Sequence, residues 1–211
     1  ELKNLNFKGG LVLSGYGEPM LHPELLKMVK ILGDDVHLEM VTNGDKLSSE
    51  IVIDLFKNGL DVMVVSMYDG PHQVDVFKKI FEKASIPSDS YVLRDRWYTI
   101  EEDYGVKLTN RAGVATEGRQ ILVDLYRPCN YPFYSMMLDW NGDVMLCVQD
   151  WNKKIKMGNV ASDSLIDVWQ SSGFKKYRNI LKKGKRVLSP CNECNTNGTL
   201  HGGEHLKCWN K

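Results

Sequence analysis

The sequence predicts an α/β protein followed by a small cysteine-bearing module, and three observations support this prediction. Short apolar runs alternate with helical patterns through the first half of the chain. The 211 residues are 43% hydrophobic, which suffices for one main core and a small appended module. All five cysteines stand at or after Cys129, so the second half differs in composition from the first.

The first half is predicted to contain strands that alternate with helices. The predicted strands cover 11–14, 36–42 and 61–67, and the predicted helices cover 23–32, 48–57 and 72–84. Pro23 suits the first turn of its helix, and Ser48 or Ser49 caps the next one. This alternation implies parallel strands with right-handed crossovers, in an open or closed α/β barrel or a doubly wound sheet. Such folds place their active sites at the carboxyl ends of the strands.

The second half is predicted to contain a β-hairpin and a helical segment. Strands at 133–139 and 143–149 flank Asn141-Gly142, which favours a tight hairpin turn, so Cys147 falls on the returning strand. A capping box of Ser164 and Asp167 begins the helical pattern at 165–182. Gly173 interrupts that pattern, which therefore fits one helix or two.

Charge and hydropathy limit the kinds of partner. Lys plus Arg and Asp plus Glu both number 27, so no broad field favours nucleic acid or an anionic membrane, and a small-molecule substrate is easier to accommodate. The apolar runs have the length of strands, and the chain opens without a basic and then apolar leader. We therefore expect a cytoplasmic protein without a membrane span.

Three predicted strand ends carry glycine together with small polar or acidic residues. They are Gly15-Tyr16-Gly17-Glu18-Pro19, Thr42-Asn43-Gly44 and Ser66-Met67-Tyr68-Asp69-Gly70. Any one of them is explained by what turns require. Three at one edge of a sheet indicate a ligand site, where glycine admits a ligand to the backbone and Glu18 accepts from a cationic amine.

The cysteines indicate a metal site rather than a disulfide framework. Cys129, Cys147 and the pair Cys191 and Cys194 can bring four thiolates to one point, which suits tetrahedral zinc or an iron-sulfur cluster equally well on spacing alone. Cys208 is left as a bystander or a substitute ligand. His201 and His205 flank it, which leaves open a small zinc site in the tail.

The first strand end resembles a motif of the radical S-adenosylmethionine (SAM) enzymes. In that family a Gly-x-Gly-Glu-Pro sequence engages the methionine amino group of SAM, and the other two strand ends look like those that follow it. The resemblance implies a partial (β/α)6 TIM-like barrel in residues 1–125. The SAM-binding residues it implies are Gly15, Tyr16, Gly17, Glu18, Pro19, Thr42, Asn43, Gly44 and Ser66.

The cysteine pattern resembles the C-terminal SPASM/twitch module of the same family. The resemblance rests on the cysteine spacing, on Gly158-Asn159-Val160, on a Trp-bearing helix and on Pro190-Cys191-x-x-Cys194. It implies a β-hairpin plus helix around iron and sulfur in residues 126–211. Leu200 stands where a full SPASM pattern has cysteine, so the shorter twitch form is expected, with one auxiliary [4Fe-4S] cluster on Cys129, Cys147, Cys191 and Cys194.

One part of the family pattern is missing. Radical SAM enzymes hold their catalytic cluster through Cys-x3-Cys-x2-Cys upstream of the Gly-x-Gly-Glu-Pro motif, and no cysteine precedes Cys129. Residues 3–10 read as the tail of a helix and a linker. We therefore expect that this second [4Fe-4S] cluster belongs to a missing N-terminal part, and that the chain as given is inactive. The alternative is a degenerate, non-catalytic scaffold with structural zinc.

For the complete protein the resemblance implies a radical oxidoreductase. SAM would yield a 5′-deoxyadenosyl radical that removes hydrogen from a sugar or aminocyclitol, and the auxiliary cluster would accept an electron. A flavodoxin or ferredoxin would supply the reductant. An enzyme that modifies a ribosomally made peptide is the alternative.

Two residues are candidates for catalysis on the same grounds. Arg111 stands about as far before the first cluster cysteine as an arginine of the twitch-type dehydrogenases, where it would polarise a substrate hydroxyl or contact the SAM carboxylate. As a plain alternative, it is a surface charge in a loop. Tyr68 and Trp140 are candidate pocket residues, although aromatics of this kind also fill cores.

Overall fold

The computed structural model describes residues 1–33, 35–102, 105–116 and 122–209, which form two compact units. The first unit spans residues 1–107 and the second spans 108–211. This division differs in position from the predicted domains, 1–125 and 126–211, whose boundary stays a prediction.

The first unit is built on a parallel sheet of four strands in the order β1-β2-β3-β4. The strands are β1 (Gly10–Leu13), β2 (His37–Thr42), β3 (Val62–Met67) and β4 (Tyr91–Asp95). Each strand pairs in parallel with the next, so all four carboxyl ends reach the same edge of the sheet. The α/β class is confirmed, and β4 is an additional strand that the sequence analysis did not identify.

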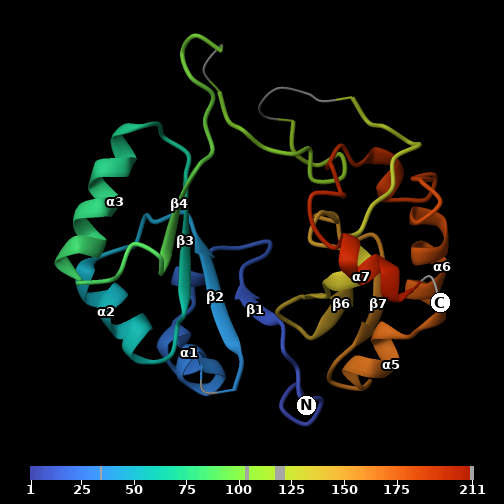
Figure 1. Cartoon of the computed structure of the whole chain (residues 1–211), viewed down its shortest axis with the longest axis horizontal. Helices are drawn as coiled ribbons and strands as arrows, with labels where there is room; N and C mark the ends of the chain where they lie inside the picture. Colours follow the sequence, from blue (N-terminus) through green and yellow to red (C-terminus); the bar gives the residue numbers. More distant parts are fainter. Residues whose placement is uncertain (34, 103–104, 117–121, 210–211) are drawn as a thin grey trace. The chain divides into compact units, whose positions relative to one another are not determined.

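Helices connect the strands and lie together along one face of the sheet (Figure 1). They are α1 (Leu25–Gly33), α2 (Ser49–Lys57) and α3 (His72–Lys83), and the short 3-10 helix η1 (Pro19–Leu21) follows β1. Ser48 caps α2, because its hydroxyl accepts from the backbone N–H of Ile51 at 3.3 Å. Residues 2–6 form turns that agree with the predicted helix tail before β1: the N–H of Leu5 donates to the carbonyl of Glu1 at 3.0 Å, that of Phe7 donates to Leu2 at 3.1 Å, and Asn6 has the left-handed φ of 49° common after a helix end.

The core of the first unit lies between the sheet and these helices. Its fully buried members include Val29, Leu38, Met40, Val52, Leu55, Met63, Val65 and Phe81. The ring of Phe81 stacks on the ring of Tyr91 with a centroid separation of 4.0 Å, which joins α3 to β4. A flat aromatic pair of this kind adds attraction to the area that it removes from water.

The second unit combines a small antiparallel sheet with short helices. Its strands are β5 (Met137–Leu138), β6 (Asp143–Met145) and β7 (Lys156–Asn159), in the order β5-β6-β7. Its helices are α4 (Tyr131–Tyr134), α5 (Leu165–Trp169), α6 (Ser172–Leu181), the 3-10 helix η2 (Cys191–Glu193) and α7 (Gly203–Cys208). The core contains Phe133, Val144, Leu146, Val168, Phe174, Tyr177 and Leu181.

Two strand predictions in this unit are wrong in extent. The segment 133–139 begins inside α4, because Pro132 suits a first helical turn, and only Met137–Leu138 is extended. The returning strand ends at Met145, so Cys147 lies in the turn that follows it. There the backbone N–H of Asp150 donates to the carbonyl of Cys147 at 3.0 Å.

The helical segment at 165–182 forms two helices. Ser164 caps α5, because its hydroxyl accepts from the N–H of Asp167 at 3.1 Å. The break falls at Ser171 rather than at Gly173. The hydroxyl of Ser171 accepts from the N–H of Phe174 and so begins α6.

Replacing Phe81 by alanine is expected to destabilise the first unit by about 3–5 kcal/mol, since it leaves a cavity beside Tyr91. Urea unfolding followed by circular dichroism measures the change. Val76→Ala is the control in the same helix, because Val76 is 52% exposed. Equal losses of stability in the two variants would contradict this account of the core.

Candidate functional site

The strand-end motifs of the first unit meet through the side chain of Glu18. Its Oε1 accepts from the hydroxyl of Thr42 at 2.7 Å and from the N–H of Met20 at 3.0 Å. Its Oε2 accepts from the N–H of Asn43 at 2.9 Å. Glu18 therefore ties the loop after β1 to the end of β2, and one acceptor position of Oε2 remains for a ligand.

The predicted SAM-contacting residues around Glu18 differ in whether their polar groups and backbone are open to a ligand. Both ends of the Asn43 side-chain amide are bonded to Asp45: Oδ1 accepts from the backbone N–H of Asp45, and Nδ2 donates to its carboxylate. A side chain at Gly44 would meet the Phe77 ring at 2.4 Å, so this glycine is required by packing. Gly17 has nothing within 4 Å of where a Cβ would stand, which leaves its backbone open to a ligand.

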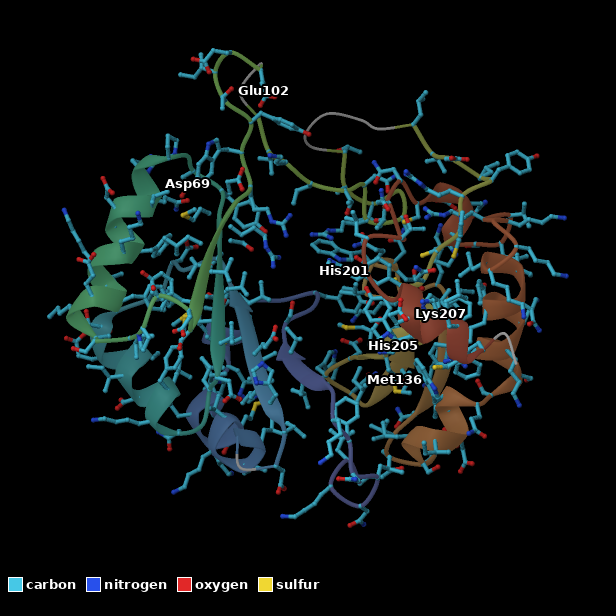
Figure 2. All side chains as sticks on the ribbon, viewed as in Figure 1. Asp69, Glu102, Met136, His201, His205 and Lys207 are labelled. Carbon is cyan, nitrogen blue, oxygen red and sulfur yellow. The ribbon has the colours of Figure 1, made fainter. Side chains whose placement is uncertain are left out.

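The remaining predicted residues of this edge lie on or beside the same strand ends. Gly15 has a φ of 133°, a conformation that favours glycine. Tyr16 and Pro19 are half-buried, and Ser66 is buried in β3. Tyr68 follows β3 and is 37% exposed. Asp69, labelled in Figure 2, accepts from the amide of Gln73 at 2.9 Å.

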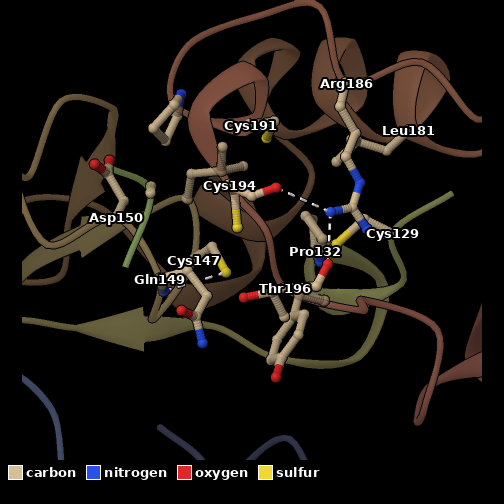
Figure 3. Close-up of a pocket in the computed structure, with 14 residues that line it drawn as sticks. Cys129, Pro132, Cys147, Gln149, Asp150, Leu181, Arg186, Cys191, Cys194 and Thr196 are labelled. Carbon is tan, nitrogen blue, oxygen red and sulfur yellow. Dashed lines mark hydrogen bonds between the residues drawn. The ribbon is translucent and has the colours of Figure 1, made fainter. Parts of the chain in front are cut away.

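In the second unit the four predicted cysteines line one cavity (Figure 3). Cys129 precedes α4, Cys147 follows β6, and Cys191 and Cys194 belong to η2 and its cap. The walls between them are largely apolar. The other lining residues are Ala112, Tyr131, Pro132, Leu146, Gln149, Asp150, Leu181, Arg186, Pro190 and Thr196.

The surroundings of three of these thiols raise their pKa values and so favour the protonated form. Burial raises the pKa of Cys129 and Cys147, and it raises the pKa of Cys191 to about 12. The neighbouring cysteines raise these pKa values further, because negative charges close together repel. The positive charge of Arg186 acts in the opposite direction on Cys129 and Cys191.

Arg111 lies beside the cavity through residues that line it. Its Nη1 donates to the hydroxyl of Thr109 at 3.2 Å and to Oε1 of Gln149 at 3.4 Å. The guanidinium also lies 5.1 Å from the ring centroid of Trp151. Gln149 lines the cavity together with the cysteines, so Arg111 is bonded to a residue of the cavity wall.

An unusual backbone stretch presents Arg111. Arg111, Ala112 and Gly113 have φ values of 48°, 54° and 88°, a left-handed run that costs free energy at the two residues that are not glycine. Asn110 holds the start of this run through reciprocal bonds with Asn195. The two backbone N–H groups each donate to the partner's Oδ1, at 2.8 Å and 3.1 Å. The Arg111 loop is thus anchored next to Cys194.

Several neighbours of the cysteines escaped the sequence analysis. Arg186 follows three lysines in the segment 182–186, which reads as a solvated run of charge, and Asn110 and Asn195 share no sequence motif. Trp140, a predicted pocket residue, is 89% exposed at the hairpin turn, so it is not buried in this cavity.

The tail residues stand apart from the cysteine cavity. Cys208 is exposed on α7, and the ring of His205 lies 5.8 Å from the ring of Tyr134. His201 and His205 are marked in Figure 2. None of the three lines the cavity, so a ligand role for Cys208 gains no support.

Within the described residues, no helix has the length and apolar character that a bilayer crossing requires.

Comparisons with known proteins agree with the site. Residues 129–195 match the SPASM family, described as an iron-sulfur cluster-binding domain. An S-adenosyl-L-methionine-dependent 2-deoxy-scyllo-inosamine dehydrogenase of Niallia circulans is 26% identical over 199 residues, which cover 92% of this chain and 76% of the relative.

Solved structures show the same likeness. A crystal structure of BtrN in complex with AdoMet and 2-DOIA superposes with a TM-score of 0.74 at 26% identity, over 92% of this chain and 76% of that one. A second BtrN structure, in an open conformation, gives a TM-score of 0.68 at 22% identity, over 92% of this chain and 75% of that one. At this identity the match supports a shared fold and nothing further. The resemblance to a SAM-dependent dehydrogenase and the SPASM character of the cysteine-bearing segment are both confirmed.

Glu18→Gln is expected to destabilise the first unit by about 1–3 kcal/mol, because an amide group would face N–H and O–H donors that now meet a carboxylate. Denaturant unfolding measures this loss. Glu24→Gln is the matched control, since its carboxylate pairs with Lys27 at the surface, and a change within about 0.5 kcal/mol is expected there. A Glu18→Gln variant as stable as the control would contradict the tie between β1 and β2.

Proposed function

We propose, from its likeness to a SAM-dependent dehydrogenase and its own match to the SPASM family, that this chain is a radical SAM oxidoreductase acting on an aminocyclitol or a related hydroxylated small molecule. One observation carries the proposal. Cysteines from three separate segments line a single cavity, and they lie in the segment that matches an iron-sulfur cluster-binding family. The four-stranded parallel sheet would be part of a TIM-like barrel, with the carboxyl ends of its strands as the SAM site.

The donor set of the cavity fits an iron-sulfur cluster. Four thiols with apolar walls are the usual ligands of a [4Fe-4S] cluster. Four thiolates would also suit a single zinc ion. The match of residues 129–195 to an iron-sulfur cluster-binding family favours the cluster over the zinc scaffold.

Such a cluster, when bound, supplies an acceptor for one electron. The chain's own residues would bind and orient the substrate. Arg111 is the candidate to polarise the substrate oxygen, because its guanidinium is fixed by Thr109, Gln149 and the Trp151 ring. A fixed cation needs no rearrangement when negative charge develops on that oxygen.

In the first unit the proposed SAM site is the loop that Glu18 holds. The free acceptor position of Glu18 and the open backbone of Gly17 are what an amino-acid group of a cofactor would use. Thr42, Asn43, Gly44 and Ser66 would shape the edge, since their own hydrogen bonds and packing are largely internal. Tyr68 stays a candidate substrate contact. A flavodoxin or ferredoxin stays the expected reductant, and the relative's substrate favours an aminocyclitol over a peptide.

The first test is the content of iron and sulfide after reconstitution without oxygen. We expect about four irons per chain with matching sulfide, and a loss of most of both in Cys191→Ala. Cys208→Ala is the matched control, because Cys208 is an exposed thiol outside the cavity, and it should keep its full content. About one zinc per chain without sulfide would contradict the proposal.

A second test addresses Arg111 and uses the complete protein in a form that cleaves SAM. Arg111→Ala is expected to lower substrate oxidation by about 10²–10³-fold, the usual cost of removing one charge-stabilising donor. SAM cleavage that is not coupled to product should persist, and Arg111→Lys should recover part of the rate. The ratio of 5′-deoxyadenosine to oxidised product measures this uncoupling. An equal fall in both products would indicate a structural role instead, and Lys175→Ala, at an exposed position on α6, is the control.

A further inference from the structure

We propose that Arg186 is the positioning and charge-balancing residue of the cysteine cavity. It would fix the two chain segments that carry Cys129 and Cys194, and it would stabilise the negative charge that a cluster held there gains on reduction. The inference rests on the proposed iron-sulfur function of the four cysteines.

The first argument is the use that the chain makes of the guanidinium. Arg186 is 2% exposed, and its N–H groups point at backbone carbonyl oxygens. Nε donates to Arg127 at 3.0 Å, and Nη2 donates to Pro128 at 2.9 Å, so two bonds hold the residues just before Cys129. A guanidinium has five such donors in a fixed fork, which suits it to this task better than an ammonium.

The same group holds the segment around Cys194. Nη1 donates to the carbonyl of Thr196 at 2.6 Å and to that of Cys194 at 3.4 Å, and both bonds appear as dashed lines in Figure 3. Nη2 also donates to Asn197 at 2.8 Å. One side chain therefore joins two cysteine-bearing segments that lie far apart in the sequence.

The second argument is the charge that this arrangement leaves in place. Every hydrogen-bond acceptor found for Arg186 in the described part of the chain is a neutral carbonyl, and no carboxylate pairs with it there. A buried cation satisfied only by carbonyl groups keeps its charge available to other neighbours. The four cysteines line the same cavity as Arg186, and their thiolates would need such a charge.

Gly198 shows how closely the cation and a thiol approach each other. A Cβ at this position would stand 2.5 Å from Nη2 of Arg186 and 2.8 Å from Sγ of Cys129. Gly198 has a φ of 77°, and a Cβ there would clash with both groups at once. No side chain fits at this position, because the guanidinium of Arg186 and the thiol of Cys129 lie close together there.

The expected consequence concerns the reduction potential. A cluster gains one negative charge when it takes up one electron, and the net charge around a cluster is among the factors that set its potential. A fixed cation beside Cys129 makes that reduction easier. Because the cluster is proposed to accept an electron from the substrate, the higher reduction potential that Arg186 gives it would favour this transfer.

A matched control exists in the same unit. Arg178 is also 2% exposed, and it is held by carbonyl groups at 2.7 Å and 2.6 Å and by the rings of Trp169 and Trp209 at 4.0 Å and 4.1 Å. It does not line the cysteine cavity. Losing it should disturb packing to a similar degree without acting directly on the cluster.

The experiment is a redox titration of the reconstituted chain, followed by electron paramagnetic resonance. Arg186→Met should give a more negative midpoint potential than wild type, Arg186→Lys should stay near wild type, and Arg178→Met should leave the potential unchanged. An unchanged potential in Arg186→Met, or an equal fall in Arg186→Lys, would overturn the proposal.

Iron retention keeps the test decisive if Arg186→Met does not hold a cluster. Arg186→Gln is then the second neutral variant, since it keeps two N–H donors without a charge. Retention of iron by Arg186→Lys and its loss from both neutral variants would support the charge-balancing role, and its loss from all three would overturn it. A wild-type chain that takes up no iron and sulfide would instead refute the proposed function itself.

Discussion

Both candidate sites depend on one kind of interaction, in which a charged side chain bonds the backbone of segments that are distant in sequence. Glu18 accepts from the N–H groups of Met20 and Asn43, and Arg186 donates to the carbonyl groups that flank Cys129 and Cys194. Backbone groups in loops must find partners, and a charged partner gives stronger bonds than a neutral one. Each site is therefore held together by one charged side chain that joins its segments.

The two side chains differ in sign in a way that matches their surroundings. The anionic Glu18 gathers N–H donors at the strand ends, where a cofactor with an amino group is proposed to bind. The cationic Arg186 gathers carbonyl groups beside the thiols, where an anionic cluster is proposed to form. In each case the charge that organises the loops has the sign that also favours the expected ligand.

The first half of the chain was predictable because its pattern is local. Alternating apolar runs and helix caps, such as Ser48, determine elements that depend on near neighbours. The strand β4 was missed, since Tyr91–Asp95 mixes charged and apolar residues and is extended because β3 pairs with it. In the second unit the predicted hairpin forms between β5 and β6, but Pro132 and the bonds around Cys147 and Asp150 shorten its two strands.

The cysteine ligands could be named from sequence, whereas the groups that hold them could not. Cysteine is rare and its spacing is informative, so Cys129, Cys147, Cys191 and Cys194 stand out. Arg186 and the Asn110–Asn195 pair act through the tertiary fold, and nothing in the lysine-rich segment before Arg186 distinguishes it from a surface charge. Side chains that bond backbone leave no periodic signal.

The order of the cysteines along the chain bears on how the protein matures. Cys191 and Cys194 follow α6, so the cavity is complete only after that helix has left the ribosome and packed on the rest of the unit. Once the unit has folded, burial raises the pKa of Cys147 and Cys191, which slows the oxidation of these two thiols until metal is loaded. Loading of the metal must then release protons from the cavity, so maturation is coupled to proton release as well as to folding.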